Sequence, residues 1–165
     1  MQKFLEGANI VAAFVPVDTQ TAENAGDWVN LSKWGRVLCV LFKAAGIAGD
    51  DPVFTLNQAK DNAGGSAKAL TFTDIWKKVG TQTGIASFTK VVQAAAGTYT
   101  DAASAEAQTI MAVEVKASDL DVANDFTHVQ LVIPDTGAGG AQLGCAFYIM
   151  LDPTFSGSTL ESAIA

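Results

Sequence analysis

Hydrophobic and polar residues alternate along most of the chain, in short stretches separated by Gly, Asp, Asn, Pro and Ser. A period of two places successive side chains on opposite faces of a strand, so each stretch predicts a β-strand. The stretches cover residues 9–17, 27–31, 33–43, 52–59, 69–76, 87–93, 109–116, 126–133 and 143–151. Residues 98–108 lack this alternation and predict a long exposed loop, in which 101–108 could form a short helix.

The phase of the alternation assigns side chains to a buried or an exposed face. In residues 126–133, Val129, Leu131 and Ile133 are predicted to face inward, whereas His128 and Gln130 face outward. In residues 143–151, the apolar odd-numbered positions, ending at Leu151, are assigned to the buried face. One shared core is therefore expected to contain Val129, Leu131, Leu143, Cys145, Phe147 and Ile149.

The stretch 33–43, KWGRVLCVLFK, is apolar on both faces. Val37, Cys39 and Leu41 occupy one face, and a strand of this kind is either central or has its other face covered by a partner. The other face supplies the candidate interface residues Trp34, Arg36, Leu38, Val40 and Phe42.

About eight strands at this spacing predict an all-β, antiparallel β-sandwich. The 165 residues fit one domain, 1–165, with a core at about 9–151 and a C-terminal tail at 152–165. Neither an internal repeat nor a domain linker is visible.

Composition narrows the classes of partner. The net charge is -7 and Arg36 is the sole arginine, whereas a nucleic-acid-binding protein should show a basic stripe. Direct nucleic-acid binding is therefore not expected. No stretch reaches the roughly 18 apolar residues of a membrane-spanning helix, so no membrane partner is expected either. Cys39 and Cys145 each lie in an apolar run and are interpreted as reduced core thiols, although one disulfide remains an alternative.

The segment SDLDVANDFTHVQLVI, residues 118–133, gathers acidic side chains beside the only histidine. Asp119 and Asp121 resemble the start of a calcium loop, but positions six and twelve hold Asn124 and Gln130 instead of glycine and glutamate. A corner between two strands explains the segment better, so we expect no bound ion.

In this corner the Ser118 and Asp119 side chains should accept backbone N–H bonds at a single helical turn. Asp121 should likewise bond a backbone N–H group. Leu120 and Val122 should enter the core. Asn124 or Asp125 should adopt the left-handed conformation that reverses the chain. The predicted structural corner comprises Ser118, Asp119, Asp121, Asn124 and Asp125.

The sequence carries no catalytic signature. His128 could act as a base near neutral pH, but the G-x-S-x-G motif that would present a serine nucleophile does not occur. The glycine-rich GAGG and GTQTG lack the lysine of a phosphate loop. We therefore expect no enzyme, no catalytic residue, no metal site and no cofactor. Trp28, Trp34 and Trp76 could form a sugar-stacking platform, although core or interface positions are the preferred interpretation.

Three stretches of this sequence carry a family resemblance: AGDWVNLSKWGRVLCVLFKAAG, PVFTLNQAKDNAGGSAKALTFTDIW and VEVKASDLDVANDFTHVQLVI. In order and spacing, from about Asn9 to Leu151, the chain resembles small virion proteins of tailed bacteriophages, of the head decoration, cement or auxiliary capsid type. These are structural patterns without a catalytic motif.

The resemblance implies a jelly-roll-like sandwich that binds the major capsid protein on the capsid exterior, after synthesis in the host cytoplasm. It also implies a non-enzymatic homo-oligomer, for which we expect a dimer or trimer. The alternative is a neck or tail protein, or a carbohydrate-binding receptor module of the virion, because a sandwich fold does not fix function.

Overall fold

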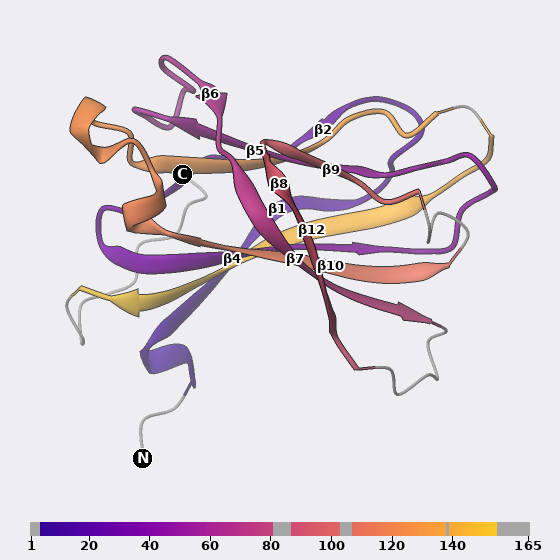
Figure 1. Ribbon diagram of the computed structural model, residues 1–165, viewed down its shortest axis with the longest axis horizontal. Helices are drawn as coiled ribbons and strands as arrows, with labels where there is room; N and C mark the ends of the chain where they lie inside the picture. Colours follow the sequence, from indigo (N-terminus) through magenta and orange to yellow (C-terminus); the bar gives the residue numbers. More distant parts are fainter. Residues whose placement is uncertain (1–3, 81–86, 103–106, 138, 155–165) are drawn as a thin grey trace.

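The computed structural model describes residues 4–80, 87–102, 107–137 and 139–154, and these form two packed antiparallel sheets (Figure 1). Sheet A has the strand order β1-β12-β4-β10-β7-β8. Its strands are β1 (Ala8–Asp18), β12 (Leu143–Pro153), β4 (Trp34–Lys43), β10 (Gln108–Lys116), β7 (Phe72–Gly80) and β8 (Thr89–Ala96). Sheet B is formed by β2 (Asn24–Ala25), β3 (Val29–Asn30), β11 (His128–Ile133), β5 (Val53–Ala59), β6 (Lys68–Ala69) and β9 (Thr98–Thr100). Three short 3-10 helices are η1 (Phe4–Glu6), η2 (Ala117–Asp119) and η3 (Val122–Asn124).

The strands pair in the nested order of a jelly roll. The first strand pairs with the last, β1 with β12, and the next pairs inward are β2 and β3 with β11, β4 with β10, and β5 with β9. The chain therefore crosses between the sheets as it winds, which closes one sandwich around a shared core. Strands β7 and β8 form an additional antiparallel pair that extends sheet A beyond β10. The predicted all-β sandwich is confirmed.

The strand count differs from the prediction of about eight. Twelve strands are present in the described residues, but β2, β3, β6 and β9 are only two or three residues long. The expected loop at 98–108 contains one of them, β9, so that part of the prediction is wrong. Asp101, which follows β9, is fully buried, and its charge is compensated by an ion pair with Lys77 of β7. Residues 103–106 of the suggested helix lie outside the described residues.

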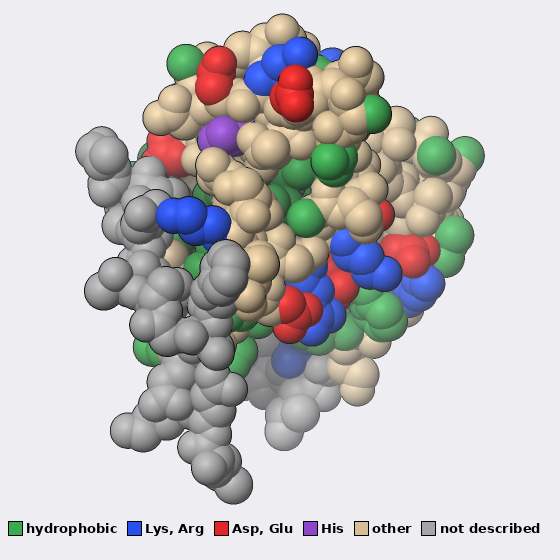
Figure 2. Space-filling view, turned by 90° about the vertical axis from the view of Figure 1, so that its left-hand side faces the viewer, with side chains coloured by type: hydrophobic (Ala, Val, Ile, Leu, Met, Phe, Trp, Pro, Cys, Tyr) green, Lys and Arg blue, Asp and Glu red, His purple; other side chains and the backbone are tan. Residues whose placement is uncertain are grey.

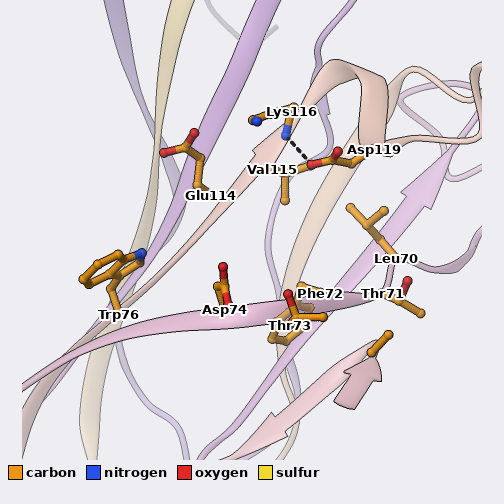
Figure 3. Close-up of a pocket in the computed structure, with 11 residues that line it drawn as sticks. Leu70, Thr71, Phe72, Thr73, Asp74, Trp76, Glu114, Val115, Lys116 and Asp119 are labelled. Atoms are coloured by element: carbon orange, nitrogen blue, oxygen red, sulfur yellow. Dashed lines mark hydrogen bonds between the residues drawn. The ribbon is translucent and has the colours of Figure 1, made fainter. Parts of the chain in front are cut away.

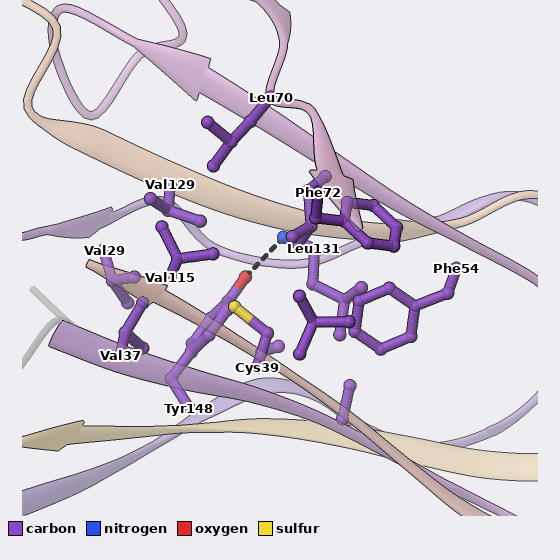
Figure 4. Close-up of a cluster of buried hydrophobic side chains, with 14 of the residues drawn as sticks. Val29, Val37, Cys39, Phe54, Leu70, Phe72, Val115, Val129, Leu131 and Tyr148 are labelled. Atoms are coloured by element: carbon purple, nitrogen blue, oxygen red, sulfur yellow. Dashed lines mark hydrogen bonds between the residues drawn. The ribbon is translucent and has the colours of Figure 1, made fainter. Parts of the chain in front are cut away.

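The core between the sheets follows the alternation of the central strands (Figure 4). Val37, Cys39 and Leu41 of β4 face Val129 and Leu131 of β11, and all five side chains are almost completely excluded from solvent. Burial of large aliphatic side chains in such a layer supplies most of the driving force for folding. The inward positions predicted for residues 126–133 are confirmed.

Tyr148 connects the two sheets through its hydroxyl group (Figure 4). It projects from β12, accepts a 2.8 Å hydrogen bond from the backbone N–H of Leu131 in sheet B, and donates a 2.9 Å bond to the Asp27 carbonyl. Gly26 lies against this hydroxyl: a Cβ at residue 26 would come within 2.8 Å of the Tyr148 oxygen and of the Leu131 carbonyl. A glycine is therefore needed where the chain passes between the sheets.

The phase predicted for β12 is wrong. Its inward-facing residues are Gly144, Ala146, Tyr148 and Met150, so Leu143, Cys145, Phe147 and Ile149 point away from sheet B. Because β12 is apolar on both faces, the hydrophobic pattern did not determine which face is buried. Leu143, Phe147 and Ile149 therefore lie on the outside of sheet A, as does Leu151, which was also assigned to the buried face.

Candidate functional site

Sheet A carries a second apolar surface on the side that faces away from sheet B. The strand register aligns Ile10, Ile149 and Leu38 in one row across β1, β12 and β4. The next row begins with Ala12 and Phe147, and neighbouring residues of β4 and β10 continue the surface. This outer face comprises Ile10, Ala12, Leu38, Val40, Phe42, Ile110, Ala112, Cys145, Phe147 and Ile149.

The outer face is accessible at its margin and well packed at its centre. Ile10 is 53% exposed and Phe42 is 45% exposed, whereas Val40 and Ala112 are almost fully covered by their neighbours. Large contiguous apolar patches are uncommon on monomeric soluble proteins and usually mark a contact surface. This face is therefore the strongest candidate for a protein interface in the described residues.

Charged side chains lie beside the apolar residues. Arg36 bonds Glu114 of β10 at 3.2 Å and Asp152 of β12 at 2.8 Å. Both carboxylates raise the pKa of Arg36 above its usual value. The hydrogen bond and the charge of Glu114 have the largest effects, and the charge of Asp152 comes next. An apolar centre with a polar rim is the usual composition of a protein interface.

The structure divides the candidate interface residues into two groups. Arg36, Leu38, Val40 and Phe42 lie on the outer side of sheet A. Trp34 is instead part of the core and only 8% exposed. The backbone N–H of Trp34 donates to the Leu31 carbonyl and closes the turn that precedes β4. The side chain of Trp34 therefore does not follow the regular alternation of β4.

The corner between β10 and β11 is built from η2 and η3. The Asp119 carboxylate accepts the Lys116 backbone N–H at 2.9 Å, as predicted, and Leu120 is buried. Asp125 adopts the predicted left-handed conformation, with φ of 63°. Ser118 is exposed and forms no hydrogen bond within the described part of the chain, so the cap expected there is not present.

Two further expectations for the corner are wrong. The Asp121 carboxylate binds side chains, Lys68 and Asn124, and not a backbone N–H group. Two hydrogen bonds lower the pKa of the Asp121 carboxylate: the larger effect comes from Lys68 and the smaller one from Asn124. Val122 is 59% exposed instead of entering the core. The partner from β6 could not be identified from the local pattern, because Lys68 is 53 residues away in sequence.

His128 lies on the outer side of sheet B, as predicted, but it is buried, so the expectation of a solvent-facing or interface histidine is wrong in its first alternative. Its Nδ1 is 2.9 Å from the Thr127 hydroxyl. Burial lowers the pKa of His128, and the negative charge of Asp61 opposes this effect. In Figure 2 the histidine shows only a small purple area, surrounded by uncharged atoms, so its access to solvent is restricted.

The two cysteines are free and occupy different environments. Cys39 is in the core, where burial raises the pKa of its thiol, so it fits the predicted reduced core residue. Cys145 lies on the outer face of sheet A and is partly exposed, which corrects its assignment to the core. Neither thiol is near the deprotonated state that a nucleophile requires, because burial raises the pKa of Cys145 as well.

Neither a protein-family model nor a curated protein matches this chain. Among the described residues, no helix has the length and hydrophobicity needed to cross a membrane. The outer side chains of β12 are among the residues that were placed wrongly from the sequence. The signal that could have located them is their size beside the small inward residues Gly144 and Ala146.

Proposed function

We propose that this chain is a non-enzymatic structural protein of a tailed-bacteriophage virion, which decorates or cements the capsid exterior by binding the major capsid protein as a homo-oligomer. The observation that carries the proposal is the apolar outer face of sheet A. In an isolated monomer this second layer of large apolar side chains would remain exposed to water, whereas a partner would cover it. The resemblance of the sequence to small virion proteins supplies the biological setting.

The dimensions of the outer face set the strength of self-association. Its four strands, about 4.8 Å apart, span roughly 19 Å, and three rows of outward residues about 7 Å apart span roughly 20 Å. The face thus covers on the order of 400 Å², and two copies packed face to face would bury about 800 Å² in total. That area is below the roughly 1,200 Å² of a specific, stable interface, so the contact through this face alone is weak. Contact with a repetitive shell would then gain from multivalency.

The burial of the reactive groups supports a binding role. The His128 ring, whose Nδ1 lies 2.9 Å from the Thr127 hydroxyl, is buried, and Cys39 lies in the core. A nucleophilic mechanism needs its base and its nucleophile where a substrate can reach them.

Light scattering combined with capsid sedimentation tests the proposal. The wild type should have two or three times the 17.1 kDa mass of the chain and should sediment with capsids. Phe42→Asp places a charge on the outer face and should yield a monomer. Val122→Asp is the matched control, because Val122 is similarly exposed but lies in the corner, and it should leave the mass unchanged. A monomeric wild type that does not sediment with capsids would refute the proposal.

The same apolar face would suit a neck or tail protein, so its position in the virion needs a separate measurement. Cryo-electron microscopy of purified particles would locate the subunit directly. Density on the outer surface of the head supports the decoration role, whereas density at the neck or tail supports the alternative.

A further inference from the structure

A groove opens within sheet A where two strands part (Figure 3). Strand β7 pairs with β10 only from Trp76 to Gly80, whereas β10 remains paired with β4 as far as Lys116. The gap between the diverging strands has a volume of about 610 Å³. This size lies within the range of about 300–1,000 Å³ that is typical of small-molecule sites.

The lining of the groove combines an aromatic ring with fixed polar groups. Trp76 is 41% exposed and borders the groove, and two hydroxyl-bearing residues precede it, Thr73 in β7 and Thr71 directly before this strand. Figure 3 shows Trp76 and Asp74 along β7, with Glu114 opposite them on β10. We infer that this groove is a saccharide-binding site. It adjoins the apolar outer face of sheet A, because Trp76 pairs with Ala112 and Glu114 pairs with Leu38.

Two of the carboxylates are already held in position. One Asp74 oxygen bonds Lys90 at 2.9 Å, and one Glu114 oxygen bonds Arg36 at 3.2 Å. The second oxygen of each has no partner within the described part of the chain and remains an acceptor for a ligand hydroxyl. Carboxylates that are fixed before binding lose less entropy when they bond a ligand, and bonds to charged acceptors are stronger than neutral ones.

The open edge of β10 adds main-chain groups to the site. The backbone N–H of Lys116 donates to the Asp119 carboxylate and so points away from β4. Backbone groups of successive residues point to opposite sides of a strand, so those of Glu114, two residues before Lys116, point to the same side and face the groove. Strand pairing with β7 does not reach Glu114. Since Asp119 blocks the end of this edge, too few residues remain open for an added peptide strand.

The charge balance of the groove favours a neutral ligand. The negative charges of Asp74, Glu114 and Asp119 are offset by Lys116 within the groove and by the ion-pair partners of the first two at its margin. A strongly anionic or cationic ligand would meet no net opposite charge. A pyranose ring instead offers hydroxyl donors to the carboxylates and an apolar C–H face to the Trp76 indole.

A glycan array followed by NMR titration tests the saccharide site. The folded full chain is applied to an array of bacterial surface oligosaccharides, and the amide shifts are then followed with the best-binding oligosaccharide. We expect weak binding, roughly millimolar because the groove is open, with shifts confined to β7, the end of β10 and η2. Trp76→Ala should weaken binding at least about tenfold, since it removes the stacking surface.

Isosteric variants separate recognition from folding. Glu114→Gln should also weaken binding, whereas Asp125→Asn should not, because Asp125 lies in the corner outside the groove and asparagine tolerates its left-handed backbone. An array on which nothing binds overturns the inference, as does binding that survives Trp76→Ala in a protein with unchanged thermal stability. A basic peptide that produces the groove shifts when no oligosaccharide does would also refute it. Phe42 does not line the groove, so capsid sedimentation of Phe42→Asp reports separately on the proposed function.

Discussion

Replacing Tyr148 with phenylalanine removes a single oxygen atom from the contact between the sheets. That oxygen accepts the N–H of Leu131 and donates to the carbonyl of Asp27. Tyr148 is fully buried, and the burial raises the pKa of its hydroxyl, which therefore remains protonated and able to donate. The ring of phenylalanine fills the same space, so the change isolates the two hydrogen bonds.

The expected loss of stability depends on which of the two hydrogen-bond partners of the hydroxyl can bond water instead. The Leu131 N–H lies in a fully buried residue and would be left without this acceptor, which costs about 1–3 kcal/mol. Asp27 is exposed, so its carbonyl can bond water instead and contributes little. A decrease of about 2 kcal/mol in the free energy of unfolding is expected. For a chain of this length that corresponds to a Tm lower by roughly 4–8 °C.

Urea denaturation and thermal melts, both followed by circular dichroism, measure this loss. The control is Tyr99→Phe, the same chemical change at a partly buried tyrosine whose hydroxyl bonds Lys77 at 3.2 Å. Lys77 keeps its bond to Asp101 in that variant, so the control should lose less than about 1 kcal/mol. Equal losses in the two variants, or a Tyr148→Phe variant as stable as the wild type, would refute the role assigned to the hydroxyl.

Two further predictions concern buried ionisable groups. Burial lowers the pKa of His128, so its contribution to stability should be complete above about pH 6.5 and lost as the pH falls from there through the folded-state pKa; His128→Gln should flatten the dependence of Tm on pH between about 7.5 and 5. Asp101→Asn leaves the buried Lys77 ammonium without its carboxylate partner, so urea denaturation should show a loss of about 3–5 kcal/mol. A variant Asp101→Asn within about 1 kcal/mol of the wild type would contradict this estimate.

The sequence determined the faces of β11 but not those of β12, and the difference has a physical cause. In β11 the polar His128 and Gln130 interrupt the apolar residues, so only one phase buries a continuous apolar row. In β12 both phases bury apolar residues, and the choice depends on the sheet opposite. The Tyr148 hydroxyl accepts a hydrogen bond from the Leu131 N–H in the opposite sheet. The residues near Tyr148 in the sequence do not indicate that partner.

The candidate sites show the same limit. The left-handed Asp125 and the Asp119 cap could be predicted, because each depends on residues within a few positions. The Lys68 partner of Asp121 and the groove between β7 and β10 depend on strands brought together by the fold. Arg36 shows both aspects: its place on the face of β4 follows from alternation, whereas its carboxylate partners come from β10 and the end of β12.

The nested strand order has a consequence for biosynthesis. Strand β12 lies between β1 and β4, so these two strands, made early, stay apart until residues 143–153 have left the ribosome. Until then each has an unpaired edge, which is a site of incorrect pairing between nascent chains. The same late strand completes the apolar outer face with Phe147 and Ile149. The self-association that we propose for this face therefore requires translation of β12, which would order folding before assembly.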